Sequence, residues 1–317
     1  MKTIYVIVVL IILAPFLTAC VYSAIYTART EEAHPAAGIF LELNEAKTHI
    51  VRQGQEGPTV LMIHGASANA QEFTHTLSPR LRDTHRVLMA DRPGHGYSVR
   101  PKNASTLKVQ AEQMAGILEA LAPGEKTIVV GHSFGGGVAL RLALDRPDLV
   151  SALVLAAPVS HDWGTDAHAW YSSAAANPVY GGAFAQIIPA AGPRQVRESI
   201  SGVFSPEPAP DGYFDNSAIG LLFRPSHFRA NARDVLKLRS ELAAQQGRYG
   251  ELSMPIAVFS GLQDSVIKPK FHVDQLAKQV PQLERIDYPD GGHMPHHAHG
   301  DEIADKVREI SSALAAN

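Results

Sequence analysis

A serine set between glycines offers the clearest chemistry in the chain, because residues 131–135 read GHSFG. The run follows the β-branched segment 127–130 directly and leads into small and apolar residues that fit a helix. Gly-x-Ser-x-Gly between a strand and a helix is typical of a nucleophile elbow, the tight turn that exposes a serine hydroxyl. Gly131 and Gly135 are needed there because larger side chains would clash in so tight a turn. The pattern predicts Ser133 as a nucleophile suited to acyl transfer.

Attack of a serine on a carbonyl also needs backbone donors for the negative charge that develops on oxygen. Phe134 N–H stands beside Ser133 at the start of the predicted helix, where the helix dipole favours an anion. The loop after the strand predicted at 59–63 supplies the second donor in this architecture. We expect that donor to be Ala66 N–H. Three more residues are expected to support the two turns: His64, Gly65 and His132.

A serine hydroxyl needs a base, and the base needs a group that orients it. Asp264 and His293 each lie in the loop that follows a predicted strand, with the acid before the histidine along the chain. Both therefore lie at carboxyl ends of parallel strands, at the sheet edge where Ser133 is expected. We predict that His293 takes and returns the proton and that Asp264 holds its tautomer. Asp162, just past another predicted strand, is the rival acid.

Three more histidines near the C-terminus raise the question of a metal site: His296, His297 and His299. Their spacing matches no closed set of ligands, and the next carboxylate along the chain is Asp301. We therefore expect solvated residues of a loop or of a first helical turn. His95, in the run DRPGHG, is expected to brace a loop beside the site. No metal and no organic cofactor is predicted.

The elements that must position these residues alternate between strands and helices. Short apolar or β-branched runs predict strands at residues 38–43, 48–52, 59–63, 86–90, 127–130, 152–156, 256–260 and 283–288. Helical spacing occurs at residues 70–82, 107–121, 135–144 and 302–314. This alternation predicts an α/β fold, with a mostly parallel eight-stranded sheet and helices on both of its faces.

The alternation stops between residues 158 and 250, where the sequence is rich in alanine, proline and aromatic residues. So long a stretch must fold by itself rather than serve as a connection. We interpret it as a helical cap inserted into a core that comprises residues 38–157 and 251–317. Residues 27–37 (TARTEEAHPAA) are predicted to be a short polar tether in front of that core.

The first 26 residues are predicted to be a signal peptide or a membrane anchor. Residues 4–17 are almost wholly apolar and follow a single positive charge, Lys2. Residues 17–20 (LTAC) resemble the bacterial lipoprotein box, which makes Cys20 a candidate for lipidation. An uncleaved membrane helix and simple secretion are the alternatives. In each case the rest of the chain is exported to the periplasmic or extracytoplasmic side, and the first two also attach it to the membrane.

Composition excludes several classes of protein. The 317 residues carry 28 Lys+Arg against 31 Asp+Glu, and this balance argues against a broad basic surface for nucleic acid. Hydrophobic residues make up 45% and charged residues 19%, so a large core can form and disorder is excluded. A single cysteine, Cys20, excludes an intrachain disulfide and a cysteine-based zinc site.

From about residue 38 to its end, the chain resembles the α/β-hydrolase superfamily. Five motifs carry the resemblance, in the order of that family: HG at 64–65, DRPGHGYS at 91–98, GHSFGG at 131–136, GLQD at 261–264 and GH at 292–293. The resemblance implies a Ser-Asp-His hydrolase with a cap between the sixth and seventh strands of the sheet. The second motif looks like the epoxide hydrolase-like branch. Epoxide hydrolases of this fold attack with an aspartate, however, whereas Ser133 fits acyl transfer.

These observations predict a serine hydrolase that cleaves carboxylic esters through an acyl-enzyme. The aromatic cap favours a small or lipid-like apolar ester as the substrate, although a cap needs such residues merely to fold. The same triad serves hydrolysis of C–C, amide or lactone bonds and perhydrolysis, and the sequence does not separate these. A non-catalytic binding protein would need a damaged triad or oxyanion loop, and the sequence has neither. The expected partners are a small-molecule ester and a membrane, without nucleic acid.

Overall fold

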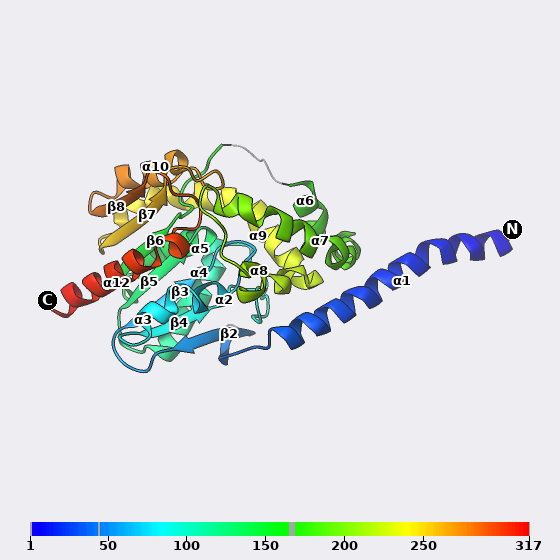
Figure 1. The fold of residues 1–317 in the computed structure, drawn as a ribbon, viewed down its shortest axis with the longest axis horizontal. Coiled ribbons are helices and arrows are strands. Elements are labelled where there is room, and N and C mark those ends of the chain that lie inside the picture. The colour runs from blue at the N-terminus through cyan, green and yellow to red at the C-terminus, as the bar shows by residue number, and fades with distance from the viewer. Residues whose placement is uncertain (1, 44, 165–168, 317) are drawn as a thin grey trace.

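The computed structural model describes residues 2–43, 45–164 and 169–316, with side chains from Leu13 onward (Figure 1). Its centre is one eight-stranded sheet with the strand order β1-β2-β4-β3-β5-β6-β7-β8. β2 pairs antiparallel with β1 and with β4, and all other neighbours pair in parallel. The predicted α/β fold with a mostly parallel sheet is thus confirmed. The strands are β1 (Ile39–Leu43), β2 (Ala46–Gln53), β3 (Thr59–Ile63), β4 (Arg86–Ala90), β5 (Thr127–His132), β6 (Val150–Ala156), β7 (Ile256–Gly261) and β8 (Leu283–Tyr288).

Burial along the strands follows from their place in the sheet. Every residue of β3, β5 and β7 is buried, because helices cover both faces of the central strands. That is why these segments read as continuous apolar runs in the sequence. The edge strand β8 instead contains only half-buried and exposed residues. The ends of the buried strands β5 and β7 are therefore held firmly, and the candidate loops that carry Ser133 and Asp264 begin there.

Helices cover both faces of the sheet. α4 (Leu107–Leu121), α5 (Phe134–Asp145) and α10 (Val273–Gln279) share one apolar cluster with it. On the other face, a second cluster holds α2 (Gln71–Thr74), α3 (Ser78–Leu81) and α12 (Gly300–Ala315). The single helix expected over 70–82 is thus two short ones. Pro79 lies in the first turn of α3, a position that needs no backbone N–H.

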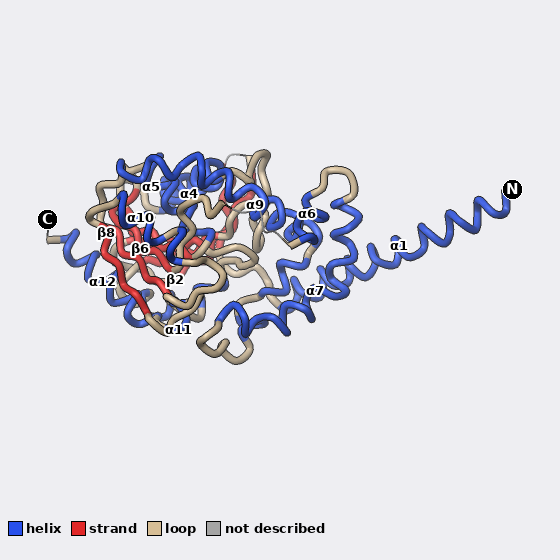
Figure 2. The backbone as a smooth tube through the Cα atoms, turned by 90° about the horizontal axis from the view of Figure 1, so that it is seen from above, coloured by secondary structure: helices blue, strands red, loops and turns tan. Residues whose placement is uncertain are grey.

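Between β6 and β7 the chain forms helices that stand apart from the sheet (Figure 2). We call residues 158–250 the cap. Phe214, Phe223 and Phe228 pack together in its interior, so these aromatic residues serve the folding of the cap itself. Its elements are α6 (Trp170–Ala176), α7 (Gly181–Phe204), α8 (Tyr213–Asn216), η1 (Ile219–Phe223), α9 (Pro225–Gln245) and η2 (Gln246–Glu251). The remaining short elements are η3 (Pro269–Phe271) and α11 (Pro295–Ala298).

The N-terminal helix α1 (Lys2–Ala33) projects from the body and ends against the cap (Figure 1). Tyr26 OH donates a hydrogen bond to the carbonyl of η1 residue Gly220 (3.0 Å). Glu31 pairs with the buried Arg224 at the start of α9 (2.7 Å). The short polar tether predicted over 27–37 is therefore helical over its first seven residues, as the end of α1. Its charged residues are helical, and one of them holds the cap.

The apolar segment predicted as a signal or anchor starts at residue 4, and the side chains of residues 2–12 lie outside the described part. Cys20 is half-buried on α1. Among the described residues, no helix combines the length and the apolar character that crossing a bilayer requires.

Candidate active site

Ser133 occupies a strained turn between β5 and α5. Its backbone has φ 51° and ψ −116°, in a region that non-glycine residues rarely adopt. Such a conformation costs about 1–3 kcal/mol and persists only where the surroundings enforce it. A Cβ on Gly131 would lie 2.7 Å from the carbonyl oxygen of Gly135, and one on Gly135 would lie 2.0 Å from that of Ile63. Both positions therefore require glycine, as expected for a turn of this tightness.

The loop after β3 lies directly beside the serine. A Cβ on Gly65 would come within 3.2 Å of Ser133 Cβ, so the two backbones approach closely. Ala66 is the next residue of this loop. On the other side, Phe134 is the first residue of α5, so its N–H has no acceptor within the helix. The two expected oxyanion donors thus lie in the segments that border Ser133.

His293 and Asp264 are brought together at the carboxyl ends of β8 and β7. His293 Nδ1–H donates to Asp264 Oδ2 over 2.7 Å, and both side chains are buried. The other carboxylate oxygen, Oδ1, accepts the backbone N–H groups of Val266 and Ile267 (2.8 Å each). These bonds aim the carboxylate at the imidazole. The rival acid Asp162 pairs with Arg239 of α9 instead.

His132, in the elbow, holds the loop that carries His293. The Nε2–H of His132 donates to the backbone carbonyl of His293 over 3.1 Å, and the centroids of the two rings lie 5.0 Å apart. Burial lowers the pKa of His132 well below its usual value, so the ring stays neutral. Within the described residues, the Ser133 hydroxyl makes no hydrogen bond to His293. In enzymes without substrate this bond is often long and tightens only when substrate is present.

The predicted triad residues are each buried in this state. Ser133, Asp264 and His293 are 6%, 4% and 5% exposed. The segment that follows α7 lies directly over the histidine loop, because Glu207 Oε2 accepts the N–H of Gly292 (2.8 Å). The cap segment that follows α7 thus covers the loop that carries His293.

Arg92 donates two side-chain hydrogen bonds to the loop after β3, which we call the oxyanion loop because it carries the expected donor Ala66. Its Nη2 donates to the carbonyl of Gly65 (3.0 Å), and its Nε donates to that of His64 (3.1 Å). His64 is fully buried, and its Nε2 accepts the backbone N–H of Arg92 (3.0 Å). Burial lowers the pKa of His64 to about 3, so it is a neutral structural residue.

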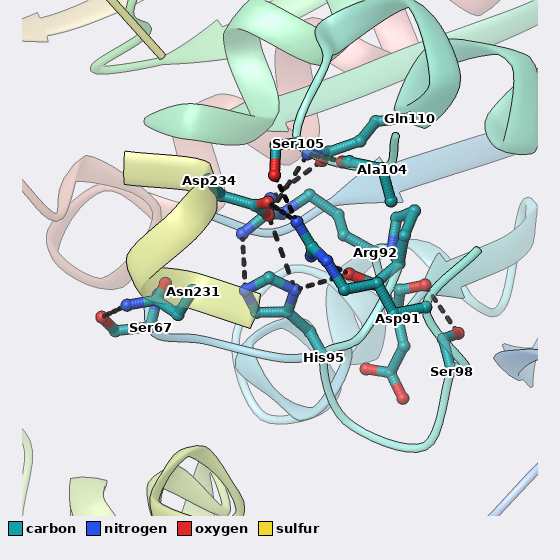
Figure 3. Close-up of polar contacts among 12 residues, drawn as sticks. Ser67, Asp91, Arg92, His95, Ser98, Ala104, Ser105, Gln110, Asn231 and Asp234 are labelled. Carbon is teal, nitrogen blue, oxygen red and sulfur yellow. Dashed lines mark hydrogen bonds and ion pairs between the residues drawn. The ribbon is translucent and has the colours of Figure 1, made fainter. Parts of the chain in front are cut away.

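A cap residue also binds this loop, and Figure 3 shows Asn231 of α9 next to Ser67. Asn231 of α9 accepts the N–H of Ser67 through Oδ1 (2.7 Å) and donates through Nδ2 to its hydroxyl (3.1 Å). Ser67 has φ 62°, a left-handed conformation that a non-glycine residue needs help to keep. Sequence reasoning missed Asn231, because nothing in the cap sequence marks this one amide.

Arg92 also belongs to a buried charged network that joins core and cap (Figure 3). Its Nη1 donates to Asp234 Oδ2 on α9 (3.2 Å), while Arg100 binds Oδ1 (2.5 Å). Burial lowers the pKa of Arg92 to about 10 and raises that of Asp234. Both shifts favour the neutral forms, so desolvation here outweighs attraction. His95 is buried in this network, where Arg92 Nη2 donates to its Nε2 (3.2 Å).

The histidines after Pro295 are not solvated as predicted. His296 is fully buried, and His297 is nearly so. Both Nε2–H groups donate to one carboxylate oxygen, Oε1 of Glu72 on α2, over 2.9 and 2.7 Å. The expectation failed because it sought a carboxylate nearby in sequence, whereas the fold supplies one from 224 residues away. His299 instead stacks on Tyr288 at the surface.

Comparisons with known proteins agree with this architecture. A family model described as alpha/beta hydrolase fold matches residues 58–299. Lipase LipV of Mycobacterium tuberculosis is 40% identical over 112 residues, which are 35% of this chain and 41% of that one. The 2-hydroxymuconate semialdehyde hydrolase of Pseudomonas sp. CF600 is 36% identical over 123 residues, 38% of this chain and 40% of that one. The matched stretches span about a third to two fifths of the curated relatives' lengths.

Solved structures show the same fold over a longer stretch. Cfl2 from Burkholderia cenocepacia superposes with a TM-score of 0.71 at 18% identity, covering 86% of this chain and 94% of the other. At this identity the likeness concerns the fold alone, so chemistry must be argued from the residues of the site.

Proposed function

Because the chain belongs to the α/β-hydrolase fold family, we propose that it is a serine hydrolase that cleaves carboxylic esters through an acyl-enzyme. One observation carries the proposal. A serine held at positive φ between β5 and α5 shares its sheet edge with a histidine whose Nδ1–H is bound by a buried aspartate over 2.7 Å. That arrangement fixes the tautomer in which Nε2 is free to accept a proton.

In the first half of the reaction, Ser133 Oγ attacks the ester carbonyl carbon and its proton passes to His293 Nε2. Asp264 stabilises the imidazolium that forms. The carbonyl oxygen becomes an oxyanion, which Ala66 and Phe134 N–H groups are positioned to hold. When the tetrahedral intermediate collapses, the C–O bond of the alcohol breaks and His293 returns the proton to the leaving oxygen. The acyl group stays on Ser133.

In the second half, water replaces the alcohol. His293 removes a proton from water as its oxygen attacks the acyl carbon, and the same backbone donors hold the second oxyanion. Collapse releases the carboxylic acid and returns the proton to Ser133 Oγ. Every proton transfer in this cycle uses residues that the chain itself supplies.

The substrate we propose is a small or lipid-like apolar ester. A relative named a lipase supports this choice. Another relative is named a semialdehyde hydrolase, which supports hydrolysis of a different bond by the same residues as the alternative. The two proposals share Ser133, His293 and Asp264 and differ only in the substrate that is turned over.

The test is hydrolysis of p-nitrophenyl butyrate by the full chain in detergent, since α1 is part of the folded cap contact. Ser133→Ala should remove a factor on the order of 10⁶ from kcat. Asp264→Asn should also be severely impaired, whereas Asp162→Asn should retain activity because Asp162 pairs with Arg239. Equal background rates in wild type and Ser133→Ala, with both folded, would exclude the esterase and direct the search to amide, lactone and C–C substrates.

We also propose that the protein is exported and held at a membrane through its N-terminal segment, by lipid on Cys20. The apolar run at 4–17, the single preceding charge and the lone cysteine support this. Labelling cells with a fatty-acid analogue should mark the wild type and leave Cys20→Ser unmarked. Label missing from the wild type, or retained by the variant, would overturn lipidation.

A further inference from the structure

Outside the proposed triad, three potential metal ligands converge between α2 and α11. Glu72 Oε1, His296 Nε2 and His297 Nε2 all lie within 4.8 Å of one another. Glu72 comes from the first helix after the oxyanion loop, and the two histidines come from the turn that follows His293. Two imidazoles and one carboxylate are a donor set that suits zinc and its neighbours among the transition metals, rather than Mg²⁺ or Ca²⁺.

The carboxylate of Glu72 is buried without a fixed cation. It is 1% exposed, and among the described residues neither a lysine nor an arginine pairs with it. Its partners are the two imidazoles and the hydroxyl of Tyr213. A buried carboxylate without a cation is costly to keep. A bound divalent cation would offset that cost.

Neighbouring side chains already orient the three ligands. Tyr213 OH donates to Glu72 Oε2 over 2.9 Å, which leaves Oε1 turned toward the histidines. The His297 ring packs edge-to-face against Phe204 and Tyr213, at centroid distances of 5.1 and 5.3 Å. The His296 ring packs beside that of His132, 4.2 Å away. Such an outer set of contacts is what fixes ligand geometry in metal sites.

Two buried ring nitrogens without partners give an independent indication. Nδ1 of His296 and Nδ1 of His132 both lack a hydrogen bond within the described residues. Each ring donates through Nε2, so each Nδ1 carries a lone pair, and the adjacent rings present two acceptors. A metal on His296 Nε2 requires that its proton reside on Nδ1. Nδ1–H of His296 would then be a donor and Nδ1 of His132 an acceptor, in place of two acceptors side by side.

We propose that Glu72 Oε1, His296 Nε2 and His297 Nε2 bind one divalent transition-metal ion of the zinc class, with water as a fourth ligand. Ligands at about 2.0–2.2 Å around a tetrahedral ion lie about 3.3 Å apart. The present separations from Oε1 to the two nitrogens are 2.7 and 2.9 Å. The oxygen therefore needs to move away from each nitrogen by only a few tenths of an ångström, and the two nitrogens, which lie within 4.8 Å of each other, need to reach a similar spacing. No protein group is oxidised or reduced, and each imidazole that binds the ion gives up the proton on Nε2 to solvent and holds one on Nδ1.

The ion would be structural, and it does not depend on the proposed ester hydrolysis. It would join α2 to α11 and so fasten the segment that follows His293. The charge of the ion would be balanced in part by Glu72. Because the ligands come from distant parts of the chain, binding requires the folded protein and stabilises it.

The first measurement is metal content of the full chain after equilibration with Zn²⁺ and removal of free ion. We expect about one tightly held zinc per chain in the wild type and its loss in Glu72→Gln and in His297→Gln. Co²⁺ in place of Zn²⁺ should give a visible absorption band that disappears in both variants. Tyr213→Phe keeps all three ligands and should weaken binding by about 10–100-fold.

His299→Ala is the matched control, because this residue lies in the same segment but stacks on Tyr288 and pairs with Glu302. It should bind zinc as the wild type does. If Glu72→Gln does not fold, His297→Gln and Tyr213→Phe decide the question. A folded wild type that retains no zinc, or zinc retained equally by all variants, would overturn the proposal.

Discussion

Two buried polar clusters flank the proposed catalytic residues, and they treat charge in opposite ways. Around Asp234, the cations Arg92 and Arg100 contact one carboxylate directly. Around Glu72, the carboxylate contacts two imidazoles and a hydroxyl. In the first cluster arginines pair with the carboxylate, whereas among the described residues neither a lysine nor an arginine pairs with the second. The Asp234 carboxylate therefore needs no further cation, whereas the Glu72 carboxylate could be neutralised by the metal ion that we propose.

The two clusters also connect different pairs of elements. The Asp234 network binds α9 of the cap to the oxyanion loop, through Arg92 and beside Asn231. The Glu72 cluster binds α2 to the turn after His293. One cluster therefore supports the loop that carries the proposed oxyanion donor Ala66, and the other supports the segment next to the proposed base His293.

The largest expected effect comes from breaking the first cluster. Asp234→Ala leaves Arg92 buried without its carboxylate, and a buried ion pair that loses one partner destabilises a protein by about 3–5 kcal/mol. Urea unfolding of both proteins measures the difference. A loss under about 1 kcal/mol would show that water reaches Arg92 and that the network is weaker than its burial indicates.

The next largest expected effect is the increase in the free energy of unfolding when Zn²⁺ is added, which should depend on the second cluster alone. At a Zn²⁺ concentration 100 times the dissociation constant, the free energy of unfolding of the wild type should rise by about 2.7 kcal/mol. Glu72→Gln should show no such rise, whereas Asp234→Asn should show all of it. Thermal unfolding with and without Zn²⁺ checks this. An equal response in all three proteins would place the metal elsewhere on the chain.

A smaller effect concerns the cap residue that holds the oxyanion loop. Asn231→Ala removes both hydrogen bonds to Ser67 and lets its left-handed backbone relax. We expect kcat to fall about 10-fold, or about 1.4 kcal/mol, with little change in KM, because the oxyanion donors act mainly in the transition state. Steady-state kinetics on p-nitrophenyl butyrate measure the split. Asn231→Asp, which keeps an acceptor for Ser67 N–H, should recover part of the rate.

The smallest effect is a pH dependence in the first cluster. Burial raises the pKa of Asp234 above its unfolded value, so the folded state binds this proton more tightly. The stability of the wild type relative to Asp234→Asn should therefore increase as pH falls from the folded-state pKa toward about 4, and stay constant at neutral pH. Paired urea titrations at several pH values measure it. The opposite slope would mean that the arginines dominate over desolvation.

The sequence predicts the sheet and the candidate catalytic loops well, because each of these signals is local. A buried strand, the turn that ends it and the residue in that turn are contiguous, as at Ser133, Asp264 and His293. The rule that parallel strands end at the same edge of a sheet then predicts that the three residues lie close together. The predicted Asp264–His293 contact needs no further information about the fold.

The two clusters escape prediction because their contacts are not local. Glu72 meets His296 across 224 residues, and Asn231 meets Ser67 across 164. The cap that supplies Asn231 and Asp234 packs through small and aromatic residues without a period that marks these two positions. The helix over 27–33 was missed for a related reason. Its polar sequence resembles a linker until Arg224 is placed beside Glu31.

The attachment of α1 to the cap determines which part of the protein a membrane anchor on α1 would hold in place. The helix contacts α7 and η1, which belong to the cap, and Cys20 lies on the same helix. If lipid holds Cys20 at a membrane, the cap becomes the stationary part of the molecule. Any movement between the two parts would then be a movement of the core relative to a cap that the membrane holds in place.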